Sequence, residues 1–145
     1  MRARRVRAAP AEAWALVFAP GDQAVATLTE FAVEHDLQAG SFTAIGAFSS
    51  AKVAWFDLDT REYEEIAVDE QVEALSIVGD LALKDGKPFV HAHAVLGRRD
   101  GSAIGGHLLE ATVRPTLELF LHVYAEPLHR VPDEASGLAL IDPRA

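Results

Sequence analysis

Alternation of apolar and polar residues dominates the chain from Ser41 onward and limits the folds open to it. Successive side chains of a strand point to opposite faces, so a period of two predicts strands with one buried face. Phe42, Ala44 and Phe48 fall on one predicted strand, and Val53 and Trp55 on the next. Further strands are predicted over 61–68, 71–84, the segment after a turn at 85–88, 107–113 and 117–125.

One helical stripe precedes these strands. Residues 13–18 indicate a short apolar strand that Pro20-Gly21 ends, and Asp22 is a suitable N-cap for a following helix. Gly40 is predicted to end the connection after that helix. The residues expected on the buried helix face are Val25, Leu28, Phe31 and Ala32. One main helix packed on a mostly antiparallel sheet makes the predicted fold α+β.

The length of 145 residues predicts a single domain over 1–145, which can bury roughly two-thirds of its unfolded surface. Its core is expected over about 12–125, with a C-terminal extension over 126–145. The extension has no sustained periodicity. It either packs on a neighbour through Leu138, Leu140 and Ile141 or is a partly ordered terminus.

Three of the six histidines lie within seventeen residues, in His91-Ala92-His93 and Gly105-Gly106-His107. Residues i and i+2 of a strand share a face, so His91 and His93 point together, and a neighbouring strand can bring His107 beside them. Neutral imidazole is the commonest metal ligand, and three of them leave one position of zinc open. The alternative is that two histidines share a solvated strand by chance.

The turn between the two histidine strands decides whether His107 reaches that face. A two-residue Asp100-Gly101 turn would pair His93 with Leu108 and turn His107 away. A three-residue loop over 99–101, with Gly101 in the left-handed conformation, would pair His93 with His107. A bulge or close backbone approach at Gly105-Gly106 is a second route. A metal site requires one of these two routes.

The composition excludes several classes of partner. Lys and Arg total 13 against 22 Asp and Glu, so the formal charge of −9 disfavours nucleic acid and anionic membranes. The arginines within 2–7 form either a small basic arm or a solvated terminus. Without cysteine there is no disulfide or thiolate ligand, which favours a cytoplasmic location. No run approaches the roughly 20 apolar residues of a membrane helix, and a signal peptide fits poorly.

Five separated motifs occur in an order that resembles the PPC domain, named for plants and prokaryotes. They are Pro20-Gly21-Asp22, Ala44-Ile45-Gly46-Ala47, Val72-Glu73-Ala74-Leu75-Ser76, the segment from Asp85 to His93, and Gly105-Gly106-His107-Leu108. The resemblance covers roughly residues 12 to 125. It implies a sheet with a helix packed on it, a homotrimer, and a metal at His91, His93 and His107. Zinc is expected first, although imidazoles also suit nickel, cobalt, copper and iron.

In plants this domain follows AT-hooks, which engage the minor groove, and this chain has no hook. The plant segment Gly-Arg-Phe-Glu-Ile-Leu corresponds to residues 70–75 here, which keep Glu73 and Leu75 only. Glu73 either orients an imidazole from behind or is an exposed strand residue. Glu118 is open to the same two interpretations.

Two functions follow as hypotheses. The first is a trimeric protein with a three-histidine metal site, open to a small anionic ligand, a substrate or water, with no activity assigned. If hydrolysis occurs there, Glu73 or Glu118 is the candidate general base. The alternative is a DNA-associated regulatory or scaffold protein that acts through a DNA-binding partner. Direct binding of nucleic acid or membrane by the chain itself is not expected.

Overall fold

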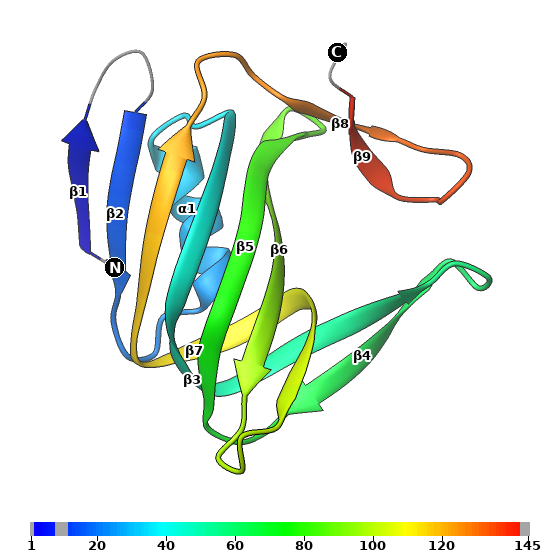
Figure 1. Cartoon of the computed structure of the whole chain (residues 1–145). Helices are drawn as coiled ribbons and strands as arrows, with labels where there is room; N and C mark the ends of the chain where they lie inside the picture. Colours follow the sequence, from blue (N-terminus) through cyan, green and yellow to red (C-terminus); the bar gives the residue numbers. More distant parts are fainter. Residues whose placement is uncertain (1, 8–11, 143–145) are drawn as a thin grey trace.

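A computed structural model describes residues 2–7 and 12–142 of the chain, which form one helix and a mostly antiparallel sheet (Figure 1). The α+β prediction is confirmed. The helix α1 spans Ala24–Glu34, which is too short to cross a membrane, and the described part of the chain contains no other α-helix. The strands are β1 (Arg2–Arg7), β2 (Glu12–Phe18), β3 (Ala39–Asp57), β4 (Glu62–Val68), β5 (Val72–Lys84), β6 (Lys87–Gly97), β7 (Ala103–Val123), β8 (His129–Pro132) and β9 (Ala139–Asp142).

Two long strands, β3 and β7, organise the sheet. They pair with each other, and the pairs β3–β5, β5–β6 and β6–β7 close a ring of hydrogen-bonded strands. β2 and β1 extend the sheet beyond β7, and β4 pairs with the second half of β3. α1 packs against one face, where it contacts β6 and β7. Its buried residues join those of β6 (Val90, Ala92, Ala94 and Leu96), which leaves the alternate residues of β6 on the opposite face.

Two strands of the structure, β3 and β7, were each predicted from the sequence as a pair of shorter strands. β3 runs without interruption over residues assigned to two strands, and so does β7. In each case an irregularity in pairing absorbs the apparent break. Between Gly46 and Phe48 of β3 the register with β7 shifts, which accommodates Arg114-Pro115 inside the longer strand. Proline is tolerated at such bulges because the local ladder is already interrupted.

The helix begins one residue later than predicted. Gln23 is at the N-cap and makes no side-chain capping bond, so the prediction of Asp22 as the cap is wrong. The Asp22 carboxylate instead accepts a hydrogen bond from the backbone N–H of Ala19 at 2.9 Å and closes the preceding turn. Gly40 does not end the connection either, because it lies inside β3, and Asp36 is the residue with positive φ after the helix. The predicted buried stripe is confirmed, with Val25 partly buried at its margin.

Both chain ends add strands that the sequence did not predict. The arginine-rich segment forms β1, which pairs with β2. The C-terminal segment forms the hairpin β8–β9, and β8 lies parallel to the end of β5 with Leu83 opposite His129. The Leu83 N–H donates to the Leu128 carbonyl at 2.7 Å. The extension is therefore fixed to the sheet of its own chain, near the end of β5 (Figure 1).

Candidate metal site

The three histidines share the sheet face opposite α1, and the turn between β6 and β7 places them there. Arg98 N–H donates to the Ser102 carbonyl at 2.8 Å, and Gly101 has φ 84°. The loop therefore comprises residues 99–101. This is the three-residue loop that the sequence analysis gave as one of two routes to a metal site. It sets His93 directly opposite His107. His91 lies two residues before His93 on the same face.

Gly105 and Gly106 allow the backbones of neighbouring strands to lie close to β7, and they do not form a bulge with β6. The pairing of β6 with β7 is regular from Ala103 to His107. A Cβ atom on Gly105 would lie 2.6 Å from the Ala94 carbonyl oxygen, and one on Gly106 would lie 2.6 Å from the Ala54 carbonyl oxygen. Both distances are far inside van der Waals contact. The glycines thus allow β7 to lie between β6 and β3 where it carries His107.

The three imidazoles are close enough that one metal ion could contact all of them. One nitrogen from each of His91, His93 and His107 lies within 4.8 Å of the other two. The rings of His91 and His107 are stacked with centroids 5.0 Å apart, and His93 stands edge-on to both. Nitrogen atoms around tetrahedral zinc are separated by about 3.3 Å. To hold zinc, the histidine side chains would therefore have to rotate so that nitrogens as far apart as 4.8 Å come closer together.

The surroundings keep two of the imidazoles neutral, which is the form that binds metal. Burial, followed by the neighbouring His91 and His93, lowers the pKa of His107 to about 4. Burial and His91 also lower the pKa of His93. The Nδ1 atom of His107 is buried and has no hydrogen-bond partner within the described chain. An unpartnered buried nitrogen costs about 1–3 kcal/mol, so the donor set fits a metal ion that would occupy it.

Asp80 is the carboxylate beside the cluster, and the sequence analysis missed it. His91 Nδ1 lies 3.1 Å from Asp80 Oδ2, and the Arg130 guanidinium donates to Asp80 Oδ1. Burial by itself would raise the pKa of Asp80, but the hydrogen bonds from His91 and Arg130 hold it below its usual range. A carboxylate that fixes the orientation of a histidine is a common support of metal sites.

A usable signal for Asp80 was present in the sequence. The Asp85-Gly86 turn joins Lys84 to Lys87, and that register alone sets Asp80 opposite His91. Asp85 and Gly86 both have positive φ, as the tight two-residue turn requires.

Glu73 and Glu118, the two carboxylates that the sequence suggested, are not brought to the histidines. Both line a separate hollow with Ile45 and Leu75. Glu73 lies five residues before Val78, the β5 partner of His93, which corresponds to roughly 16 Å along the strand. The suggestion failed because it rested on residue type without a register.

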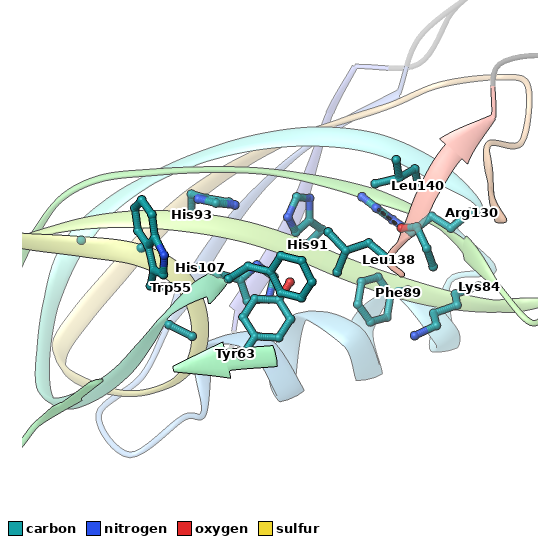
Figure 2. Close-up of a pocket in the computed structure, with 15 residues that line it drawn as sticks. Trp55, Tyr63, Lys84, Phe89, His91, His93, His107, Arg130, Leu138 and Leu140 are labelled. Carbon is teal, nitrogen blue, oxygen red and sulfur yellow. Dashed lines mark hydrogen bonds between the residues drawn. The ribbon is translucent and has the colours of Figure 1, made fainter. Parts of the chain in front are cut away.

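A cavity of about 570 Å³ opens beside the histidines. Its walls come from β3, β4, β5, β6, β7 and the β8–β9 hairpin. Figure 2 shows Trp55 near the histidines at one end and Lys84, Phe89 and Arg130 at the other. The described residues that line it are Ala54, Trp55, Phe56, Tyr63, Lys84, Phe89, His91, His93, Gly105, Gly106, His107, Arg130, Leu138, Ala139 and Leu140.

The fold and the site define a small α+β protein with a histidine cluster that could hold a metal ion. The model of the Plants and Prokaryotes Conserved (PCC) domain matches residues 7–125. The chain therefore belongs to this family, which is the PPC family that the motifs resemble. Among curated proteins, none matches the chain.

Three solved structures share this fold over nearly their whole length. A metal-containing protein from Archaeoglobus fulgidus is 36% identical, with a TM-score of 0.84 and coverage of 89% of this chain and 91% of that one. A plant- and prokaryote-conserved protein from Pyrococcus horikoshii is 30% identical, with a TM-score of 0.85 and coverage of 97% and 94%. A protein from Ralstonia eutropha JMP134, provisionally named as DNA-binding, is 28% identical, with a TM-score of 0.84 and coverage of 89% and 90%.

Proposed function

We propose that the protein binds one divalent transition metal ion per chain through His91, His93 and His107. The observation that carries this proposal is the convergence of one imidazole nitrogen from each of the three histidines within 4.8 Å, beside a buried His107 Nδ1 that has no hydrogen-bond partner among the described residues. The metal-containing relative from Archaeoglobus fulgidus supports it. Zinc is our first choice because tetrahedral zinc suits three imidazoles, and no thiolate is available in the chain.

When bound by three protein ligands, zinc keeps a position for water or a small anionic ligand and acts as a Lewis acid. The chain's own residues prepare that position. Asp80 orients His91, and the low pKa of His107 keeps its imidazole neutral and available. No Asp or Glu lines the described part of the cavity, so the hydrolytic hypothesis lacks the general base that Glu73 or Glu118 would have supplied. We assign a binding function and no reaction.

Elemental analysis of protein purified without an affinity tag tests the metal directly. We expect one equivalent of zinc or another first-row transition metal per chain. His93→Ala should lose it, and His122→Ala, on an exposed part of β7, should retain it. A full equivalent of metal in His93→Ala would refute the three-histidine site.

We propose in addition that the protein is a homotrimer that works in the cytoplasm. Several exposed apolar residues share the face that carries His93. Val78 pairs with His93 and with Thr43, and Phe120 also pairs with Thr43, so these side chains lie in one row. Val78 is 53% exposed and Phe120 57%. An uncovered row of this kind is typical of a subunit interface.

Light scattering should give three times the chain mass of 15.6 kDa. Phe120→Asp should yield monomers, whereas Val33→Asp on the exposed side of α1 should not. A wild-type mass of one chain at micromolar concentration would contradict the trimer.

A DNA-associated regulatory or scaffold role is the second candidate function, and the provisional DNA-binding name of the Ralstonia relative favours it. The net charge of −9 argues against direct contact with phosphates, so such a role would need a DNA-binding partner. Fluorescence anisotropy with an AT-rich DNA duplex over a salt series distinguishes direct DNA binding by this chain from the metal-binding function alone. We expect negligible binding at about 150 mM salt, and submicromolar binding with a steep salt dependence would favour the second candidate.

A further inference from the structure

The described lining of the cavity beside the histidines contains no carboxylate, although the protein as a whole is acidic. The chain carries a formal charge of −9, yet no Asp or Glu lines the described cavity. Its ionisable lining consists of Lys84, Arg130, Tyr63 and the three histidines. A concave site with charge of one sign concentrates ligands of the opposite sign. The expected occupant is therefore anionic.

The basic groups lie at two ends of the cavity. The histidines form one end. At the other end, the Lys84 ammonium group lies over the ring of Phe89, 5.1 Å from its centroid. Phe89 precedes His91 by two residues and His93 by four on β6, which corresponds to roughly 7 and 13 Å along the strand. Phe89 and the two histidines of β6 are thus on average about 10 Å apart along the strand.

Lys84 and Arg130 differ in what already binds them. The Arg130 side chain is only 6% exposed, and it donates to Asp80 and to the Ala139 carbonyl. No carboxylate within the described chain pairs with Lys84, whose ammonium group lies over the Phe89 ring. Lys84 is therefore the cation at this end that can bind a negative group of a ligand.

The wall between the two ends is apolar and partly aromatic. The Tyr63 ring lies 5.0 Å from that of His107, and Trp55 stands near the histidines (Figure 2). Leu138 and Leu140 of the C-terminal hairpin also line the cavity. The volume of about 570 Å³ lies within the roughly 300–1,000 Å³ typical of small-molecule sites. The hairpin that supplies these leucines lies outside the residues matched by the family model.

We propose that this cavity binds a small molecule with a carboxylate at each end of a flat apolar body. One carboxylate lies at the histidines, the other lies at Lys84, and the body packs between the aromatic rings and the two leucines of the β8–β9 hairpin. The proposal rests on the metal centre proposed above, because the metal ion would supply the positive charge that holds the first carboxylate. The C-terminal hairpin then contributes to the selection of the ligand.

Titration calorimetry with three probes tests the proposal on zinc-loaded, dialysed protein. The probes are naphthalene-2,6-dicarboxylate, 2-naphthoate and 2-naphthamide, which share one apolar body and differ in charge. We expect the diacid to bind about fivefold more tightly than the monoacid, as for one partly exposed ion pair, and the amide to bind at least tenfold more weakly than the monoacid. Removal of zinc should weaken both acids at least tenfold. Equal binding of amide and acids, or of zinc-loaded and zinc-free protein, would overturn the proposal.

Two pairs of variants locate the contacts. Lys84→Gln should abolish the advantage of the diacid over the monoacid, and Arg99→Gln, an exposed charge outside the cavity, should preserve it. Leu140→Ala should weaken both acids about fourfold, as for a loss of apolar contact equivalent to one buried methylene, and Leu58→Ala should not. An unchanged advantage in Lys84→Gln would refute the second anionic contact, and unchanged affinities in Leu140→Ala would refute the hairpin wall.

Zinc stoichiometry measured on the same samples separates the two proposals. One zinc per chain with no binding of either acid would refute the ligand class and leave the metal centre intact. Failure to bind zinc would refute the metal centre and, with it, this proposal.

Discussion

Substitution of His107 by alanine should remove the stabilisation that zinc gives the folded protein while changing the metal-free protein little. His107 contacts Tyr63 and stacks on His91, but its buried Nδ1 has no hydrogen-bond partner within the described part of the chain. Truncation to alanine loses those contacts and at the same time removes the unpartnered nitrogen. The two effects have opposite signs, so we expect the metal-free variant to melt within about 3 °C of the wild type.

The magnitude of the zinc effect follows from mass action. Zinc at about 100 times its dissociation constant stabilises the folded state by roughly 2.7 kcal/mol. The unfolding entropy of a chain of 145 residues is about 0.3 kcal/mol/K. The melting temperature of the wild type should therefore rise by about 9 °C, and that of His107→Ala by less than about 2 °C.

Differential scanning calorimetry on chelator-treated protein, with and without added zinc, measures these shifts. His129→Ala is the matched control, because His129 lies on β8 outside the cavity lining, and it should keep the full shift. His35→Ala should lower both melting temperatures, since His35 lies 4.3 Å from the Phe31 ring, but should keep the difference between them. A full zinc shift in His107→Ala would show that His107 is not a ligand.

Three further outcomes are expected. Gly106→Ala should destabilise the protein by about 1–3 kcal/mol in urea denaturation, because its Cβ would lie 2.6 Å from a backbone oxygen of β3; an unchanged midpoint would contradict the close approach. Asp80→Asn should weaken zinc binding about 10- to 100-fold in a competition titration, because His91 would lose its carboxylate partner. Hydrogen bonds from Ser102 lower the pKa of Asp100 in the folded protein. The ionised carboxylate therefore stabilises the fold at any pH above the unfolded pKa of about 3.9. This stabilisation disappears as the pH falls through the lower folded-state pKa. The melting-temperature difference between wild type and Asp100→Asn should therefore be present at about pH 7 and absent at about pH 2, and a constant difference would contradict this.

The histidine cluster was open to prediction because its geometry is local. His91 and His93 share a face in any strand, and only the loop over 99–101 had to be chosen to place His107 opposite His93. Gly101 in the left-handed conformation made the required loop possible. The sequence left both registers open because the Asp100-Gly101 pair suits a two-residue turn equally well. What decides between them is the packing of Leu108 into the core, since the other register would turn that side chain outward.

The long strands could not be predicted in the same way. Proline at position 115 is an ordinary strand breaker, and it lies where β7 shifts register against β3. The predicted break in β3, between Phe48 and Val53, likewise falls where the pairing with β7 shifts between Phe48 and Ser50 and between Lys52 and Val53. A bulge is a property of two strands together, so a local pattern in either one shows only an interruption. The prediction therefore divided two continuous strands into four.

The far end of the cavity depends on contacts that no local pattern reveals. β8 joins the sheet through two residue pairs parallel to the end of β5, after a segment that contains Pro127 and has no periodicity. That short pairing carries Arg130 to Asp80, and Asp80 in turn contacts His91. The C-terminal hairpin is therefore connected to the histidine cluster through the Asp80 carboxylate. Its leucines also line the cavity beside the histidines. Because Arg130 and Asp80 hold each other, the charge of Arg130 is neutralised within the fold, and Lys84 is left as the cation that a ligand can contact.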